Sequence, residues 1–153
     1  MKLSKRTQYA LRALADLATR SGDGPVGAEQ LANHHGMPAK YLEQILLALT
    51  NAGLLNSRRG AGGGYSLARE PGMISLGEVI RTIEGDVVLL DCVDGASPAE
   101  CTCGHRPTCG LARVVGDLSG AIGQLLAGAT LADVCDRTEA LRDAVASNPR
   151  YSI

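Results

Sequence analysis

The chain has 153 residues, of which 45% are hydrophobic and 20% are charged, and these values are typical of a globular protein. It contains no run of about 18 apolar residues, which excludes a protein that spans a bilayer with a helix. The net charge of −1 conceals an asymmetry: residues 1–70 carry nine Lys and Arg against five Asp and Glu, whereas residues 71–153 carry six against eleven. This asymmetry predicts that the N-terminal half meets a polyanion.

Cysteine usage predicts a cytoplasmic protein. The chain has five Cys, four of them in one segment, whereas a secreted disulfide scaffold spreads its cysteines through a small fold. In a reducing compartment such clustering indicates metal or redox chemistry. The basic start is like that of a signal peptide, but the charged residues Arg12, Asp16 and Arg20 interrupt what would be the apolar segment.

Helical periodicity predicts three helices before residue 53. The first spans residues 4–20, and its charged residues lie away from the apolar side formed by Ala10, Leu11, Leu14, Leu17 and Ala18. A short second helix buries Ala28, Leu31 and Ala32 and ends near His35 and Gly36. Pro38 then opens a third helix. Its predicted buried face consists of Tyr41, Leu42, Ile45, Leu46 and Leu49.

The order of these elements is typical of a winged helix-turn-helix. A short helix, a turn that contains glycine and a longer helix form the helix-turn-helix pattern. Two short extended runs follow, joined by a glycine-rich tip at residues 60–64, and they predict a β-hairpin, the wing. We therefore expect residues 1–72 to form a winged helix-turn-helix DNA-binding domain.

Beyond residue 72 the sequence predicts a mostly helical remainder. Ser75 and Glu78 have the spacing of a capping box and begin a connecting helix within residues 73–91. Residues 92–109 lack apolar periodicity and are predicted to form a loop. A long dimerisation helix and short C-terminal helices are expected over residues 110–147, and a tail over 148–153. The long helix carries one apolar stripe, formed by Val114, Val115, Leu118, Ile122, Leu125 and Leu126.

The fold class is thus mainly α with a small β-hairpin. Gly116, Gly120 and Gly123 weaken the long helix, since each costs about 1 kcal/mol relative to Ala. They are tolerable if they let another helix approach closely.

Three groups of residues are candidates for contact with DNA. The third helix would enter the major groove with its first residues nearest the bases: Pro38, Ala39, Lys40, Tyr41, Glu43 and Gln44. The wing would reach a minor groove or phosphates with Arg58 and Arg59, beside the permissive backbone of Gly60, Gly62 and Gly63. The start of the first helix would hold phosphates with Lys2, Ser4, Lys5 and Arg6. His34 and His35 are interpreted as surface or capping residues rather than ligands.

Three stretches resemble the IscR/NsrR family of bacterial winged-helix regulators: residues 1–4, residues 41–44 and, above all, the wing run from Arg59 to Tyr65. The resemblance covers about residues 1–145. It implies a homodimeric transcription regulator that pairs through the long helix and binds a palindromic operator in double-stranded DNA. Some family members carry an iron–sulfur cluster on three loop cysteines, and others carry none.

Matched residue by residue, the three cysteines of the family are Cys92, Cys103 and Cys109, and Cys101 is additional. The sequence departs from the family pattern in the spacing, because ten residues separate Cys92 from Cys103. It also departs in the fourth ligand: Ala112 stands where some members have a histidine, and Gln8 where others have an acidic residue. Cys101 is the first candidate for the fourth ligand and His105 the second.

We therefore predict a dimeric, DNA-binding regulator whose operator affinity depends on an iron–sulfur cluster of two or four irons, sensing redox state, nitric oxide or iron status. Its ligands would be Cys92, Cys101, Cys103 and Cys109. Two cluster-free alternatives remain open, a zinc site that includes His105 and a thiol switch. An enzyme, a thiol oxidoreductase working through Cys101 and Cys103, is disfavoured because the chain has no Cys-x-x-Cys pair and no βαβ pattern. Cys135 is interpreted as a small buried hydrophobe.

Overall fold

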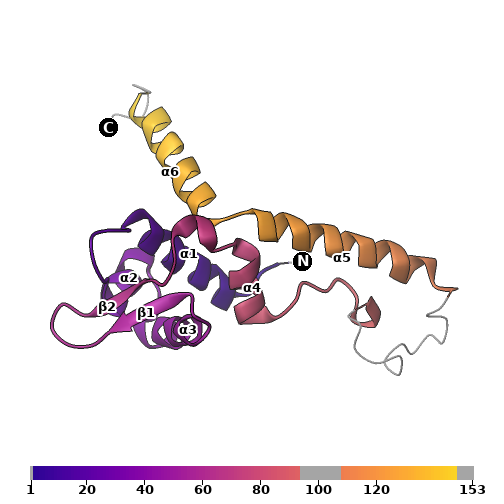
Figure 1. Cartoon of the computed structure of the whole chain (residues 1–153), viewed down its shortest axis with the longest axis horizontal. Helices are drawn as coiled ribbons and strands as arrows, with labels where there is room; N and C mark the ends of the chain where they lie inside the picture. Colours follow the sequence, from indigo (N-terminus) through magenta and orange to yellow (C-terminus); the bar gives the residue numbers. More distant parts are fainter. Residues whose placement is uncertain (1, 94–107, 148–153) are drawn as a thin grey trace.

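The computed structural model describes residues 2–93 and 108–147, and within these ranges it is mostly helical with one two-stranded antiparallel sheet (Figure 1). Its helices are α1 (Lys5–Thr19), α2 (Ala28–His35), α3 (Ala39–Asn51), α4 (Leu76–Glu84), α5 (Gly110–Gly128) and α6 (Leu131–Ala146). The strands are β1 (Leu55–Arg58) and β2 (Gly64–Leu67), and two short 3₁₀ turns are η1 (Pro71–Met73) and η2 (Asp91–Val93). The predicted fold class is confirmed.

Local signals account for the ends of the first three helices. The Ser4 hydroxyl accepts a hydrogen bond from the Thr7 N–H at the start of α1. Gly36 ends α2 in the left-handed conformation, with a φ of 60°, which glycine adopts at little cost. Pro38 is the residue before α3, where its fixed φ suits a helix start. These local signals set where the helices of the helix-turn-helix begin and end.

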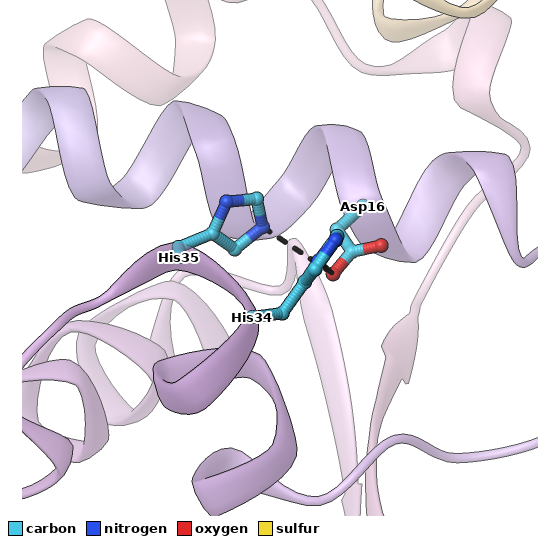
Figure 2. Close-up of side chains that lie close together, drawn as sticks. All are labelled: Asp16, His34 and His35. Atoms are coloured by element: carbon cyan, nitrogen blue, oxygen red, sulfur yellow. Dashed lines mark hydrogen bonds and ion pairs between the residues drawn. The ribbon is translucent and has the colours of Figure 1, made fainter. Parts of the chain in front are cut away.

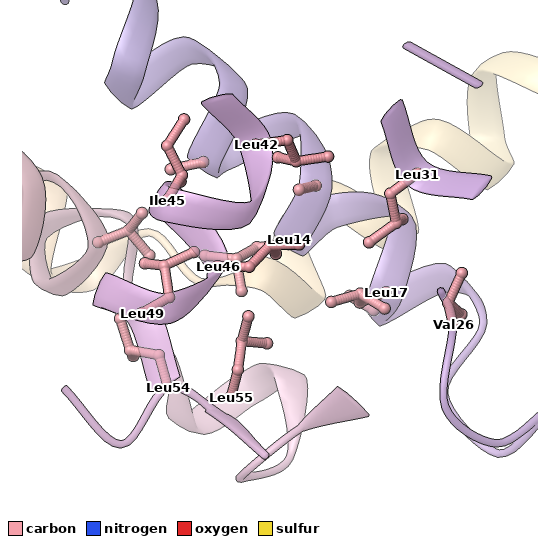
Figure 3. Close-up of a cluster of buried hydrophobic side chains, with 14 of the residues drawn as sticks. Leu14, Leu17, Val26, Leu31, Leu42, Ile45, Leu46, Leu49, Leu54 and Leu55 are labelled. Carbon is pink, nitrogen blue, oxygen red and sulfur yellow. The ribbon is translucent and has the colours of Figure 1, made fainter. Parts of the chain in front are cut away.

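Leucines from α1, α2 and α3 build the core (Figure 3). The side chains of Leu14, Leu31, Leu42, Ile45, Leu46 and Leu49 are fully buried. Tyr41, predicted to be buried with them, is instead 37% exposed. Its ring meets Tyr9 of α1 edge to face, with 6.0 Å between the ring centroids, because the tyrosine lies at the rim of the α1–α3 interface.

Asp16 also differs from expectation. The sequence placed it on the solvent side of α1, but it is only 8% exposed. The end of α2 folds over it, and both His34 and His35 approach its carboxylate. His34 is exposed, as expected for a surface residue, whereas His35 is half-buried, and both contact Asp16.

The hairpin packs beside α3 and pairs in register Leu55 to Leu67. Val26 extends it, because the N–H of Val26 donates to Tyr65 O and the N–H of Tyr65 donates to Val26 O, both at 2.9 Å. Gly64 runs so close to Val26 that a Cβ there would collide with the Val26 carbonyl. This close approach between two backbones requires glycine at position 64.

Ser75 caps α4 as predicted, and its hydroxyl accepts from the Glu78 N–H. The spacing also suggested a reciprocal hydrogen bond from the Ser75 N–H to the Glu78 carboxylate, and this bond does not form. The Glu78 carboxylate instead accepts from the Arg69 guanidinium at 2.6 Å, which ties α4 to the residues after the hairpin.

Ile74 and Leu131 connect the C-terminal helices to the core, and both are fully buried in it. The segments that precede α4 and α6 pair with each other, through Leu76 N–H to Ala129 O at 2.7 Å and Leu131 N–H to Ile74 O at 3.0 Å. Thr130 and Asp133 form a complete capping box at the start of α6. The short C-terminal helices that were expected are one helix of 16 residues, because no breaker interrupts it after this cap.

The predicted long helix is confirmed as α5, which extends away from the winged-helix body (Figure 1). Its apolar residues do not form one stripe but divide between two sides. Val115, Ile122 and Leu126 are half-buried, and on this side Gly77 of α4 lies against the backbone of Leu126. On the other side the exposed apolar residues are Leu111, Val114, Leu118 and Leu125. No helix within residues 2–93 and 108–147 is long and apolar enough to cross a membrane.

Candidate DNA-binding surface and cysteine site

One side of α3 is held by the core and the other is free to read DNA. Lys40, Glu43 and Gln44 are exposed, as the sequence predicted, because the buried residues Leu42, Ile45 and Leu46 fix the opposite side of the helix. Pro38 is exposed as well, and Ala39 is half-buried. The polar side chains thus point away from the core and are accessible from outside the molecule.

Leu47 belongs to this exposed side and was not among the predicted contacts. It is 57% exposed although it is a leucine in the middle of α3. The signal was available in the sequence, since Leu47 directly follows Leu46 and falls outside the spacing of the buried leucines. An exposed apolar side chain on this face has the chemistry to contact a thymine methyl group.

The wing presents two exposed arginines. Arg58 ends β1 and Arg59 follows it, and both are exposed, as are Gly60 and Gly62 at the tip. Gly60 and Gly62 have positive φ angles of 93° and 76°, with open space around them. Gly63 is different, because a Cβ there would collide with the carbonyl of Arg58. Its glycine is required by the tight turn inside the wing, whatever it contacts on DNA.

The start of α1 holds a carboxylate where a phosphate was expected. Glu84, at the end of α4, accepts from the Ser4 N–H at 2.7 Å and from the Thr7 hydroxyl at 2.6 Å. These hydrogen bonds, chiefly from Thr7 and then Ser4, lower the pKa of Glu84 below its ordinary value. The Ser4 hydroxyl caps α1 and the Ser4 N–H is bound to the Glu84 carboxylate, so a phosphate held by Ser4 would have to compete with this negative charge, and the predicted contact of Ser4 with DNA stays a prediction. Lys2, Lys5 and Arg6 remain exposed candidates.

Cys92 and Cys109 line one hollow at the N-terminal end of α5. Cys92 lies in η2 and Cys109 is the residue that caps α5. The hollow has a volume of about 420 Å³ and is lined by Cys92, Val93, Thr108, Cys109, Gly110, Ala112 and Arg113. Two cysteines distant in sequence are therefore brought to one site, and Cys101, Cys103 and His105 lie outside the described residues.

Cys109 stands at the first turn of α5. Its sulfur accepts from the Ala112 N–H at 3.5 Å, at the positive end of a helix of 19 residues. Cys92 and Cys109 are both half-buried, and they could supply two of the thiolate ligands that an iron–sulfur cluster uses.

The other residues considered as ligands have different environments. The side-chain amide of Gln8 donates to Leu3 O at 2.8 Å, so it is engaged within its own chain. Cys135 of α6 is half-buried against the core. Burial raises the pKa of its thiol, and the nearby carboxylates of Asp136 and Glu139 add to the effect. A neutral, packed thiol agrees with the interpretation of Cys135 as a small hydrophobe.

Comparison with known proteins connects this arrangement to a family. Residues 3–137 match the Rrf2 family, described as iron-dependent transcriptional regulators. The chain is 33% identical over 148 residues to the regulator IscR of Yersinia pseudotuberculosis, covering 97% of this chain and 87% of IscR. It is 32% identical over 142 residues to NsrR of Bacillus licheniformis, covering 93% of this chain and 97% of NsrR. The solved structure of CymR, the global cysteine regulator of Bacillus subtilis, superposes with a TM-score of 0.73 at 31% identity, covering 90% of this chain and 98% of CymR.

Proposed function

Because the chain belongs to the Rrf2 family of DNA-binding transcription regulators, we propose that it is a cytoplasmic homodimer whose operator affinity is set by an iron–sulfur cluster on its cysteine segment. The observation that carries the proposal is the placement of Cys92 and Cys109 in one hollow at the start of α5. Family membership supports regulation of transcription rather than catalysis. The cluster, the dimer and the operator contacts go beyond family membership and are our proposal.

The DNA-reading surface would consist of the exposed side of α3 and the wing. Lys40, Glu43, Gln44 and Leu47 line one side of α3, and Arg58 and Arg59 extend the surface into the hairpin. A recognition helix contacts base edges while a basic wing contacts the backbone or the minor groove. The charge asymmetry of the sequence agrees with this division, since the excess of basic residues lies within residues 1–70.

The exposed side of α5 would form the dimer seam. Its apolar residues Leu111, Val114, Leu118 and Leu125 are separated by three, four and seven positions, and Ala121 fills the gap in the repeat. Steps of three and four are those of the seam between two paired helices. Pairing along α5 would place two winged helices on one DNA molecule, and a palindromic operator with half-sites about 34–36 Å apart would then contact both.

The cysteine site would couple to the dimer through η2. Val93 of η2 faces Gly116 of α5, where an added Cβ would lie 3.3 Å from the valine methyl. Ligation of Cys92 and Cys109 would therefore fix η2 against the first turns of α5. A bound cluster would supply reactivity toward oxygen and nitric oxide at this point. A change of 100-fold in operator occupancy requires only about 2.7 kcal/mol of differential binding between the two states.

The test is the composition of protein prepared without oxygen. We expect iron and acid-labile sulfide in equal amounts, lost together in Cys92→Ser and Cys109→Ser. Cys135→Ala is the matched control, because it removes a cysteine packed on the core and should leave iron and sulfide unchanged.

Two other compositions would contradict the cluster. Stoichiometric zinc without sulfide would assign the cysteines to a zinc site. Protein that holds neither metal but forms disulfides under oxidant would assign them to a thiol switch.

A further inference from the structure

A second group of metal-binding side chains lies in the DNA-binding half, far in sequence from the cysteines. Asp16 of α1 meets His34 and His35 at the end of α2, and the ligand atoms of all three lie within 4.8 Å of one another. Figure 2 shows both imidazole rings converging on the Asp16 carboxylate. From this geometry we propose that Asp16, His34 and His35 bind a divalent transition-metal ion of the zinc class.

Two of the three separations between the ligand atoms are close to those that such an ion imposes. Nδ1 of His34 lies 2.8 Å and Nε2 of His35 lies 3.3 Å from the same oxygen, Oδ2 of Asp16. In a tetrahedral site with bonds of about 2.1 Å, neighbouring ligand atoms are roughly 3.4 Å apart. The separation between Asp16 Oδ2 and His34 Nδ1 would have to open by about 0.6 Å. The nitrogens of His34 and His35 lie within 4.8 Å of each other, so side-chain rotations would admit the ion between three side chains that the fold has brought together.

Hydrogen bonding within this group of three residues leaves one buried nitrogen, Nε2 of His35, without a hydrogen bond. Nδ1 of His34 forms a hydrogen bond with Asp16. Nε2 of His35 lies 3.3 Å from the same carboxylate oxygen but is not oriented to form a hydrogen bond with it. Nε2 of His35 is buried and, among the described residues, has no hydrogen-bond partner. A buried polar nitrogen without a partner is costly, and a metal ion would satisfy it.

Burial and charge favour a ligand of this kind. The Asp16 side chain is 6% exposed, whereas that of His34 is 55% exposed, so the site is anchored in the core and open on one side to an ion and a water ligand. Burial raises the pKa of Asp16, but hydrogen bonds from His34 and Arg20 outweigh it and lower the pKa overall, so the carboxylate is ionised at neutral pH. Arg20 holds the other oxygen, Oδ1, at 2.8 Å. Its positive charge opposes a second cation, but its position leaves Oδ2 to the histidines.

The site lies where it can affect DNA reading. His35 is followed by Gly36, which makes the turn, by Met37, which is buried, and by Pro38 before α3. An ion bound to α1 and to the end of α2 would therefore fix the turn that positions α3. This link is separate from the cysteine site and would operate in protein that lacks a cluster.

The experiment uses the full chain with Cys92, Cys101, Cys103 and Cys109 changed to Ser and Cys135 to Ala, so that thiols cannot bind the probe. Zinc ion is titrated against a chromophoric chelator, and thermal unfolding is followed with and without zinc. We expect one zinc per protomer and a higher unfolding temperature with zinc, because the ion binds only the folded chain. His34→Gln and His35→Gln should each weaken binding at least tenfold, since even indirect partners of a metal ligand change affinity by about 10–100-fold.

His105→Gln is the matched control, because it removes the remaining histidine of the chain and should leave zinc affinity unchanged. His34 is more than half exposed, so its Gln variant should fold, and circular dichroism without metal checks this. Cobalt should give the visible bands of a tetrahedral site with nitrogen and oxygen ligands, lost in the same two variants. The proposal is overturned if the cysteine-free chain binds no zinc, or if folded His34→Gln and His35→Gln proteins bind it as tightly as their parent.

Discussion

Single residues show where the chain could be predicted from its sequence and where it could not. Ser4, Gly36 and Ser75 act through local hydrogen bonds or a local φ angle. The helix ends that they set can therefore be predicted from residues that are adjacent in the sequence. Asp16 and Glu84 act across the fold, and their partners come from α2 and from the start of α1. No periodicity within one helix could reveal these contacts, because they depend on how the helices pack.

Gly64 supplies the first prediction at this scale. In Gly64→Ala the new Cβ would collide with the Val26 carbonyl, at a φ of 152° that side chains rarely adopt. We expect a loss of about 2 kcal/mol or more in the free energy of unfolding, measured by urea denaturation. The control is Gly62→Ala, which has a positive φ but open space, and it should lose only about 1 kcal/mol. Equal losses in both variants would show that the contact with Val26 does not matter.

Glu84 supplies a prediction about pH. Its pKa in the folded chain lies below the ordinary value of 4.5, because Thr7 and Ser4 donate hydrogen bonds to the carboxylate. The stabilisation is therefore present above about pH 4.5 and is lost as the pH falls through the lower folded value. Glu84→Gln should show a smaller loss of unfolding free energy between about pH 5 and pH 3 than the parent chain. If Glu84→Gln and the exposed-site control Glu70→Gln follow the parent curve alike, the hydrogen bonds to Glu84 contribute nothing to acid stability.

At the scale of elements, periodicity predicted that α3 and α5 exist but not how each divides its faces. The buried side of α3 was predicted correctly except for Tyr41, because a tyrosine in helical register with Ile45 is indistinguishable from a core residue until α1 is in place. In α5 the apolar residues divide between contacts with α4 and η2 and an exposed side. That division reflects tertiary packing, and the single predicted stripe could not show it.

Leu46 and Leu47 form a matched pair for the DNA-reading helix. Leu46→Ala removes a fully buried side chain and should lower the unfolding free energy by about 2–5 kcal/mol. Leu47→Ala removes an exposed one and should change it by less than about 0.5 kcal/mol while weakening operator binding in fluorescence anisotropy. Operator affinity that is unaffected in Leu47→Ala would remove this residue from the reading surface.

At the scale of the whole molecule, the basic half and the acidic half of the sequence contain different structural elements. The winged helix and the exposed residues of α3 belong to the basic half, and α5, α6 and the cysteine hollow belong to the acidic half. The difference in charge between the two halves could be counted from the sequence. That Cys92 and Cys109 share a site was expected from the family resemblance, but the packing of η2 against the start of α5 that brings them to one hollow could not be predicted from the sequence.

Leu118 tests whether α5 pairs two protomers. Leu118→Lys places a charge in the exposed apolar side of α5 and should give a monomer in analytical ultracentrifugation, with operator affinity reduced by more than tenfold. Asp117→Lys places the same side chain one position away, on an exposed polar site, and should remain dimeric. A dimeric Leu118→Lys protein would move the interface away from this side of α5.

The central claim is that the state of the cysteine segment sets the affinity of the dimer for DNA. The most direct measurement is anaerobic anisotropy with an operator selected from random duplexes, comparing the parent chain with a variant in which Cys92, Cys101, Cys103 and Cys109 are Ser, at one salt concentration. We predict that the two affinities differ by about 100-fold, and that Cys135→Ala binds like the parent. Equal affinity of the parent and the four-serine variant for the operator would contradict the account.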